Sequence, residues 1–476
     1  MTTDRTGGYS SSDDEVAGAR RPISIVIVPG FVLVETRVIQ SGLGFASDQA
    51  LRANRAFAER LHKLSRLVAG RQPDLDGSAG PLDQAQLALL DDSIKLDQQT
   101  CREALWDLRD IGGGLRSKLN QEVVERLRYY EFLRDDVPPE RQPALTFQEQ
   151  DRAPILWEMM HEGSLTDYPP RWEQFWGFRV PITHWPADGE PASDITMRNG
   201  LYSATNEDLD FAGREIAQLA QRLKLGLPQG NLASAFENQV RQALRAQMDG
   251  DEDKLAAWWQ SCQGAWLNHF VRELTDREGG DERFAESWLR TALVASFQDS
   301  LRYDLIHFAC HCQTSAQTEF LSELQMKVAG TLIPLNVALL ASGELRRERR
   351  TVRDHGPLVF LNACGTGEQS DSYEPPGFPA EWIGNLSALA VVATLCPVPD
   401  YFAHAFALKF YDFLFQATVD STTPEIARNR YIAEALLATR RYFMETYNNP
   451  LGLAYVLYAF KGANILNDFV QVGGVA

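Results

Sequence analysis

The hydrophobic positions of the chain follow two patterns that alternate along its length. Short apolar runs typical of buried strands lie at 23–28, 144–147, 154–160, 175–182, 303–309, 357–361 and 389–395. Between them, Leu, Ala and Phe recur every three to four residues among charged residues, which predicts amphipathic helices. These helices are expected at 47–70, 82–136 with a break near 112–114, 206–225, 231–300, 320–350, 401–417 and 424–446. Strands that alternate with helices predict an α/β fold with a mostly parallel sheet, flanked by helices on both faces.

These patterns divide the chain into four segments. Residues 1–20 are rich in Ser, Gly and Asp and predict a disordered tail. Residues 21–205 are expected to form an N-terminal α/β half. Residues 206–300 read as a helical, acidic insertion or regulatory segment, and residues 301–476 as a second α/β half.

Composition narrows the range of partners. The chain has 46 Lys and Arg against 64 Asp and Glu, a formal net charge of −18. A surface that binds nucleic acid needs clustered basic residues, whereas here they are scattered. The one short basic run, at 346–350, is interpreted as solvated surface. Nucleic acid is therefore not expected as a substrate, although a small basic pocket for a nucleotide signal stays possible.

The cellular setting also follows from composition. No apolar stretch approaches the ~18 residues of a membrane span, and the polar residues 1–21 do not resemble a secretory signal. The six cysteines do not form the dense framework of a small secreted domain. We therefore expect a cytoplasmic protein without a membrane partner, in which an unpaired cysteine can serve as a nucleophile.

Two of the predicted strands end in chemically reactive residues. One ends in the run from His307 to Cys312, and the other in Asn362-Ala-Cys-Gly-Thr-Gly367. Neighbouring parallel strands bring their carboxyl ends to one edge of a sheet. His311 and Cys364, 53 residues apart in the chain, are therefore expected to meet there.

A histidine beside a cysteine has a clear chemical use. A free thiol has a pKa of ~8.5, so only a small part of it is thiolate near neutral pH. An imidazole can accept the thiol proton during attack and return it to a leaving amine, a contribution of roughly 10²–10⁴-fold in rate. Gly365 lets the backbone after Cys364 turn sharply and present its amides to an oxyanion.

A zinc site is the alternative interpretation of the first strand end. His307, Cys310, His311 and Cys312 lie close in the sequence. Structural zinc sites usually combine spaced ligand pairs from two elements, and no second pair such as Cys-x-x-Cys occurs. We therefore predict no metal and no cofactor, and interpret His307 as a core residue or one that supports the site.

The two motifs resemble those of the CHAT proteases, bacterial relatives of caspases and separases in peptidase clan CD. Residues 304–311 resemble the family's histidine motif, and residues 358–367 its cysteine motif. The resemblance implies a caspase-like fold with a pseudo-protease N-terminal half, His311 as general base and Cys364 as nucleophile. It also implies an oxyanion hole of the backbone amides of Cys312, Cys364 and Gly365, although Cys312 stands where the family usually has glycine.

The resemblance suggests a specificity residue as well. In related separases an acidic residue after the next strand receives a substrate arginine, and Asp400 occupies a comparable segment. Asp400 would then favour a basic residue before the cleaved bond. The alternative is that Asp400 caps the helix that begins at Tyr401, a common role for aspartate.

The resulting hypothesis is a regulated cysteine endopeptidase that cleaves a protein substrate through an acyl-enzyme. The resemblance suggests a bacterial defence or cell-death pathway, with an activating partner or signal. The alternatives are a catalytically idle scaffold that kept the fold, or a nucleotide-sensing binding protein. The sequence predicts no particular oligomeric state.

Overall fold

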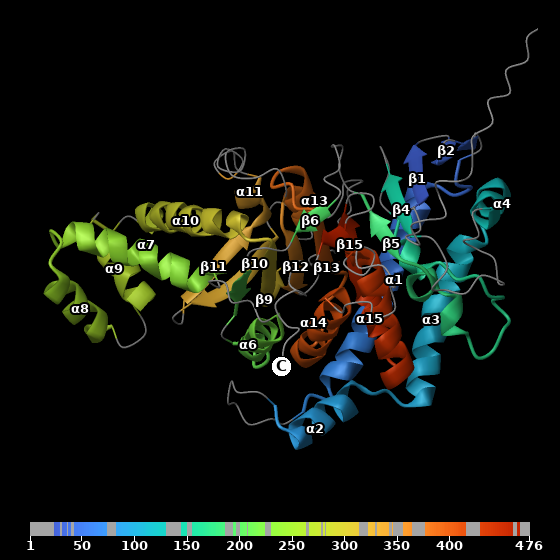
Figure 1. The fold of residues 1–476 in the computed structure, drawn as a ribbon, viewed down its shortest axis with the longest axis horizontal. Helices are drawn as coiled ribbons and strands as arrows, with labels where there is room; N and C mark the ends of the chain where they lie inside the picture. The colour runs from blue at the N-terminus through green and yellow to red at the C-terminus, as the bar shows by residue number, and fades with distance from the viewer. Residues whose placement is uncertain are drawn as a thin grey trace, which may run out of the picture.

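A computed structural model describes most of the 476-residue chain. The described residues are 23–28, 31–35, 37–39, 42–73, 82–129, 144–149, 155–185, 194–196, 200–206, 208–223, 230–262, 266–277, 279–280, 282–313, 322–328, 331–341, 345, 356–363, 377–415, 429–459 and 464–466. The predicted tail at 1–20 and the basic run at 346–350 lie outside them. Helices flank a central, mostly parallel sheet (Figure 1), which confirms the predicted fold class.

Thirteen of the described strands form this sheet. The strands of its first part are β1 (Ile23–Val28), β2 (Phe31–Val34), β3 (Arg37–Ile39), β4 (Leu145–Glu149) and β5 (Ile182–His184). The strands of its second part are β7 (Leu201–Thr205), β8 (Gly230–Asn231), β9 (Leu305–Gln313), β10 (Glu323–Val328), β11 (Thr331–Asn336), β12 (Leu358–Ala363), β13 (Ala390–Thr394) and β15 (Tyr455–Ala459). A small separate sheet contains β6 (Asp194–Thr196), β14 (Asn429–Tyr431) and β16 (Asn464–Leu466).

The two halves of the chain share one continuous sheet. Its order is β11-β10-β9-β12-β13-β15-β5-β4-β1-β2-β3, and β7 pairs with both β9 and β8. β15 joins the halves, because it runs antiparallel to β13 and parallel to β5, where Tyr458 lies opposite His184. β7, within the predicted N-terminal segment 21–205, pairs with β9 of the other half.

Helices cover both faces of the sheet. The helices of the first half are α1 (Ser47–Ala69), α2 (Gln84–Ile94), α3 (Gln98–Arg116), α4 (Gln121–Tyr129) and α5 (Trp176–Arg179). Those of the second half include α6 (Ala212–Leu223), α11 (Val337–Leu340), α13 (Gly377–Gly384), α14 (Asp400–Phe415) and α15 (Ile432–Tyr447). On β9, the His307 ring contacts α14 through Tyr411, while the next residue, Phe308, contacts Trp382 of α13. The apolar residues of β9, β12 and β13 are therefore enclosed from both sides.

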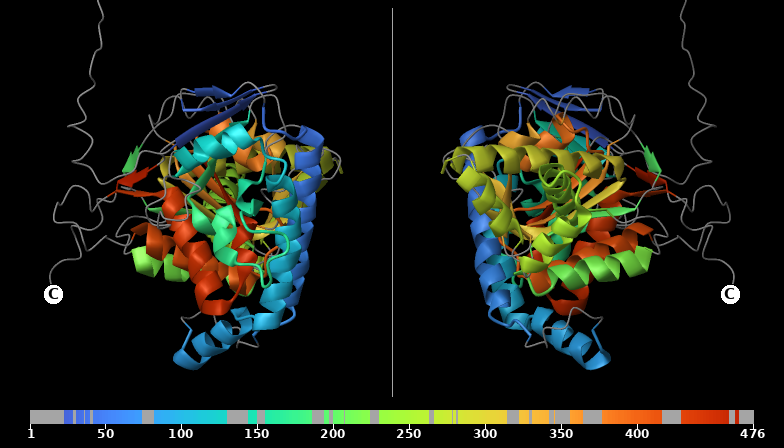
Figure 2. Two further views of the ribbon diagram at one scale, coloured as in Figure 1. Left: turned by 90° about the vertical axis from the view of Figure 1, so that its right-hand side faces the viewer. Right: turned by 90° about the vertical axis from the view of Figure 1, so that its left-hand side faces the viewer.

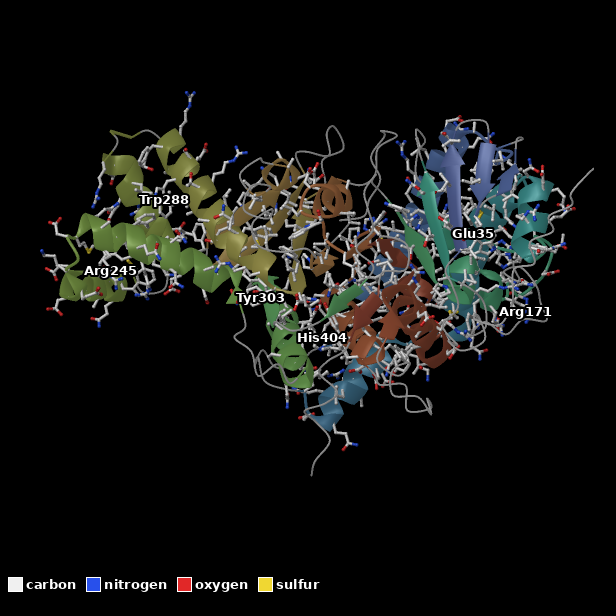
Figure 3. The ribbon with its side chains drawn as sticks, turned by 45° about the horizontal axis from the view of Figure 1, so that its top comes forward. Glu35, Arg171, Arg245, Trp288, Tyr303 and His404 are labelled. Atoms are coloured by element: carbon white, nitrogen blue, oxygen red, sulfur yellow. The ribbon has the colours of Figure 1, made fainter. Side chains whose placement is uncertain are left out.

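Four helices form an arm at one end of the molecule, as the periodicity of 231–300 predicts (Figures 1 and 3). They are α7 (Leu232–Gln247), α8 (Glu252–Ser261), α9 (Trp266–Arg277) and α10 (Glu282–Gln298). Within the arm, the Arg241 guanidinium lies 3.7 Å from the ring centre of Trp259. Figure 2 shows the same molecule from its two ends. Among the helices that the model describes, none combines the length and the hydrophobicity that crossing a bilayer requires.

Three sets of secondary-structure predictions are wrong. The runs at 154–160 and 175–182 contain the short helices Trp157–Met159 and α5, with β5 beginning only at Ile182. Aromatic residues are common in strands, but here Trp157 and Trp176 stack on each other in the core. The predicted helix at 320–350 begins as the antiparallel pair β10–β11. There, Leu324 and Met326 are buried between more exposed neighbours, the alternation of a strand.

The third error concerns the glycines at 112–114, where a helix break was expected. Helix α3 runs through them without interruption. A Cβ added at Gly112 would lie 1.7 Å from the carbonyl oxygen of Met159, so this glycine allows two backbones to approach closely. Gly112 therefore serves packing between elements, and none of the three glycines ends the helix.

Candidate active site

The carboxyl ends of β9 and β12 lie side by side. The two strands are parallel, and Ala363, the last residue of β12, lies opposite Cys310 of β9. His311 is the next residue of β9, and its side chain is exposed. None of the described residues hydrogen-bonds to its ring. The two strands are thus parallel neighbours up to Ala363, and the predicted meeting of His311 with Cys364 lies outside the described residues.

Cys364 and Gly365 lie outside the described residues. The chain reaches Cys364 directly from Ala363, and one trans peptide separates successive Cα atoms by about 3.8 Å. Of the three predicted oxyanion-hole amides, only that of Cys312 belongs to a described residue.

Cys312 lies inside strand β9, opposite Leu324 of β10. It is not among the residues with positive φ, and extended backbone suits any side chain. The position therefore does not require glycine.

A network of buried polar groups lies beneath this edge of the sheet. The Glu215 carboxylate, on α6, accepts hydrogen bonds from His307 Nε2 at 2.5 Å and from Asn362 Nδ2 at 2.8 Å. The other ring nitrogen of His307 lies 3.0 Å from the Tyr411 hydroxyl. Tyr455 completes the network by donating its hydroxyl to Asn362 Oδ1 at 2.8 Å. Both nitrogens of His307 are thus engaged within the protein, as expected of a supporting residue rather than a zinc ligand.

A further contact fixes the last peptide before Cys364. The Thr394 hydroxyl, at the end of β13, donates a hydrogen bond of 2.6 Å to the carbonyl oxygen of Ala363. Thr394 is 1% exposed, so water does not compete for this bond. Sequence reasoning did not single out Glu215, Thr394 or Tyr455. Each stands in an ordinary helix or strand pattern, without a motif that marks it.

Asp400 is the first residue of α14, the helix that follows β13 in the chain. Burial raises the pKa of its carboxyl group, while hydrogen bonds from the backbone amides of Tyr401 and Phe211 oppose that shift. The negative charges of Asp210 and Glu215 add to the increase. Its side chain accepts from the amide of the next residue, Tyr401, at 2.7 Å, whereas a capping side chain accepts from an amide two or three residues further on. The acidic surroundings are those in which an added positive charge is favourable.

His404, one turn into α14, is buried beside this region (Figure 3). Burial lowers its pKa to about 4, although the Glu215 charge opposes the shift. Its Nδ1 atom has no hydrogen-bond partner among the described residues. The imidazole is therefore neutral near physiological pH, and it adds no positive charge to the site.

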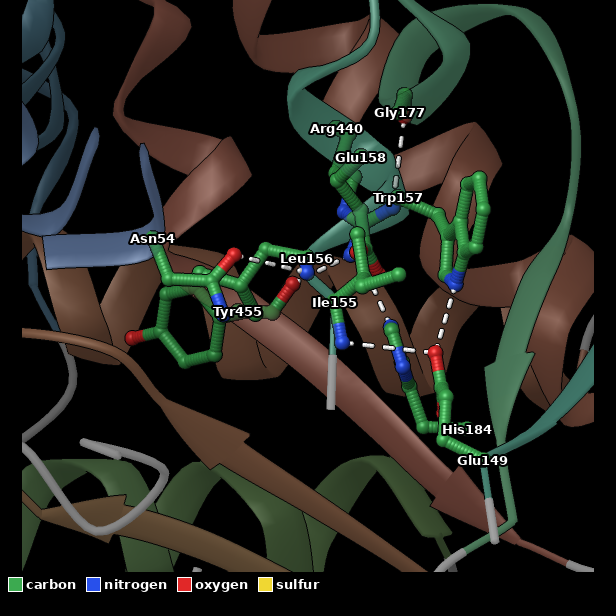
Figure 4. A network of polar contacts seen from close by, with 10 residues as sticks. All are labelled: Asn54, Glu149, Ile155, Leu156, Trp157, Glu158, Gly177, His184, Arg440 and Tyr455. Atoms are coloured by element: carbon green, nitrogen blue, oxygen red, sulfur yellow. Dashed lines mark hydrogen bonds and ion pairs between the residues drawn. The ribbon is translucent and has the colours of Figure 1, made fainter. Parts of the chain in front are cut away.

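A second buried polar cluster lies where the two halves of the sheet meet (Figure 4). Glu158 contacts His184 at 3.0 Å and Arg440 of α15 at 3.2 Å. Burial alone would raise the pKa of Glu158, but the charges of His184 and Arg440 outweigh it and lower the pKa to about 2. Arg440 also donates to the backbone carbonyl of Tyr455, whose side chain belongs to the first network.

Sequence comparison identifies the family. The model of the CHAT domain matches residues 203–449, more than half of the chain, so the chain belongs to the CHAT domain family. No curated protein sequence matches it.

Solved structures show distant likenesses. The Arg-specific cysteine proteinase gingipain R matches at 8% identity and a TM-score of 0.38, over 73% of this chain and 68% of its own. The Saccharomyces cerevisiae separase–securin complex matches at 10% identity in two crystal structures. The first match has a TM-score of 0.38 and covers 94% of this chain, and the second has a TM-score of 0.41 and covers 93%. Each covers only 30% of the chain in the matched structure.

Proposed function

We propose that this CHAT protein is a cysteine endopeptidase in which His311 is the general base and Cys364 the nucleophile. One observation carries the proposal: Cys310 and Ala363 lie opposite each other on parallel strands. The next residues along these strands are His311 and Cys364. Neighbouring strands lie about 4.8 Å apart, so an imidazole and a thiol that follow such a pair are within reach of each other.

The proposed reaction proceeds through an acyl-enzyme. His311 accepts the Cys364 proton as the sulfur attacks the peptide carbonyl carbon, and a C–S bond forms while the carbonyl oxygen becomes an oxyanion. The backbone amides of Cys312, Cys364 and Gly365 are its proposed donors. The C–N bond then breaks, and the imidazolium gives its proton to the leaving amine. Water, activated by His311, hydrolyses the thioester and frees the enzyme.

The exposure of His311 supports a role in attack on a large substrate, because a protein chain must reach the ring. The network of Glu215, His307 and Asn362 beneath it is fully enclosed and cannot itself contact a substrate. A protein substrate, an activating partner and a role in bacterial defence form part of the proposal, through the resemblance of the two motifs to CHAT proteases.

Labelling with a thiol-reactive peptide probe tests whether His311 and Cys364 act as a catalytic pair. The wild type should be labelled at Cys364, and Cys364→Ala should abolish that labelling. His311→Ala should slow it by roughly 10²–10⁴-fold, the usual contribution of a general base. Cys312→Ala, which removes the neighbouring half-buried thiol, serves as the control. Equal labelling of the wild type and His311→Ala, or labelling confined to Cys312, would contradict the proposal.

Asp400 is proposed to favour a basic residue before the cleaved bond. Two substitutions separate this role from helix capping. Asp400→Asn keeps an oxygen that can accept from the Tyr401 amide but removes the charge, whereas Asp400→Ala removes both. If Asp400 receives a cation, both variants lose the preference for Arg over Leu in the probe. If Asp400 only caps α14, Asp400→Asn keeps that preference, and Asp400→Ala loses about 1 kcal/mol of stability.

A further inference from the structure

Three hydrogen bonds meet on the last two described residues of β12. Asn362 donates to Glu215 and accepts from the Tyr455 hydroxyl, both at 2.8 Å. The carbonyl of Ala363 accepts from the Thr394 hydroxyl at 2.6 Å. Glu215, Thr394 and Tyr455 come from α6, β13 and β15, so three separate elements hold one strand end. We call these three residues the clamp.

The clamp is shielded from water. Glu215, Thr394 and Tyr455 are each at most 2% exposed, and Asn362 is 7% exposed. Buried polar groups that lose their partner are costly, so such bonds persist through thermal motion. The Tyr455 ring is also fixed in place, because it stacks on Phe406 at a centroid distance of 3.9 Å and an angle of 5°. The Tyr455 hydroxyl is therefore held within hydrogen-bonding distance of Asn362 Oδ1.

The Thr394 bond acts on the peptide that leads into Cys364. A peptide unit is planar, with its C=O and N–H directed to opposite sides. Thr394 draws the Ala363 carbonyl toward β13, one neighbour of β12. The other neighbour of β12 is β9, the strand of His311. The Ala363 carbonyl is therefore held on the side of β12 that faces β13, away from β9.

From this geometry we propose that the clamp positions the nucleophile, and that Thr394 and Tyr455 are positioning residues of the reaction. The inference rests on the proposed role of Cys364. Thr394 sets the direction of the Cys364 amide, which is a donor to the oxyanion. Tyr455 and Glu215 prevent the strand end from shifting by holding Asn362. Neither Thr394 nor Tyr455 contacts the substrate.

The chain offers a matched control for each substitution. Thr394→Val and Tyr455→Phe each remove one hydroxyl and keep the shape of the side chain. Thr439 is equally buried and donates a bond of 2.7 Å, but to Ala435 within its own helix. The hydroxyl of Tyr458, also on β15, has no hydrogen-bond partner among the described residues. Thr439→Val and Tyr458→Phe therefore remove comparable hydroxyls outside the clamp.

Two measurements on Cys364 separate positioning from general structure. Iodoacetamide alkylates the thiol at a saturated carbon, without forming an oxyanion. A peptide aldehyde adds the sulfur to its carbonyl carbon, and the carbonyl oxygen then needs the amide donors. Its affinity is measured by protection of Cys364 from iodoacetamide. Amide hydrogen exchange of a peptide covering 358–363 reports whether the strand end has loosened.

Thr394→Val and Tyr455→Phe should weaken the aldehyde by about 10- to 100-fold, as expected for a small misplacement of reacting groups. Iodoacetamide rates should match those of the controls, and Thr394→Ser, which keeps the hydroxyl, should restore the affinity. If each variant binds the aldehyde as tightly as its control, the clamp is only structural and the inference is wrong, whatever hydrogen exchange shows. A wild type whose Cys364 never binds the aldehyde would instead refute the proposed protease function.

Discussion

Glu158 and Arg440 form a fully buried ion pair, with Oε1 and Nη2 3.2 Å apart, across the junction of the two halves. Glu158 belongs to the first half and Arg440 to helix α15 of the second. Removing one partner of a buried ion pair typically costs about 3–5 kcal/mol. Arg440→Met should therefore lower the free energy of unfolding by about that amount in urea denaturation.

The neighbouring residue provides the control for this prediction. Arg441 pairs with Glu445 on the surface of the same helix, with side chains 29% and 50% exposed. Exposed pairs of this kind contribute less than about 1 kcal/mol, so Arg441→Met should have little effect. A similar loss in both variants would show that the buried pair has no special role.

The buried His404 should make the protein less stable in mild acid. Burial holds its pKa at about 4, below the ordinary value of 6.5. Between these values the unfolded chain binds a proton that the folded chain does not, so acidification favours unfolding. A difference of this size corresponds to about 3 kcal/mol, lost as the pH falls from about 6.5 to about 4. His404→Gln should remove that part of the pH dependence of unfolding.

His269→Gln is the control for this measurement, because the His269 side chain on the helical arm is 46% exposed. It should leave the pH dependence close to that of the wild type. If His404→Gln retains the full loss of stability between pH 6.5 and 4, His404 is not its source.

Two glycines of helix α3 should respond in opposite ways to alanine. A Cβ at Gly112 would clash with the Met159 carbonyl, whereas a Cβ at Gly114 would meet no atom within 4 Å. Gly114→Ala should raise the melting temperature, since alanine is favoured over glycine in helices by about 0.5–1 kcal/mol. Gly112→Ala should lower the melting temperature, because the backbone at residue 112 or at Met159 must move to relieve the clash. Equal shifts would contradict the close packing of α3 against residues 157–159.

The effect of having Cys312, where the family usually has glycine, can be tested by substitution. Because its backbone is that of an ordinary strand residue, Cys312→Gly should not increase the rate at which a peptide probe labels Cys364. A marked increase would mean that the cysteine side chain, not the backbone, obstructs the proposed oxyanion hole.

The strand ends could be predicted from sequence because their signals are local. The apolar runs at 303–309 and 357–361 predict the strands β9 and β12, and the change of pattern after each run marks its carboxyl end. The strand-like alternation of β10, with Leu324 and Met326 buried, is also present in the sequence. The prediction of a helix at 320–350 assigns it a helical period instead of a period of two.

The residues that support the site left no comparable signal. Glu215 lies 147 residues from Asn362 in the chain, and the amphipathic pattern of its helix does not distinguish it from the other charged residues there, Arg214 and Arg222. Tyr455 is one of several aromatic residues in an apolar stretch. Only the packing of α6 and β15 against β12 shows that these side chains converge.

The position of β15 has a consequence for how the molecule is made. It lies between β13 and β5 in the middle of the sheet, yet it follows the other twelve strands of that sheet in the chain. A nascent chain that has not yet produced Tyr455–Ala459 has two unjoined sheet edges, and its Asn362 side chain lacks the tyrosine hydroxyl. Completion of the large sheet and completion of the clamp therefore coincide, after the other twelve strands have been made.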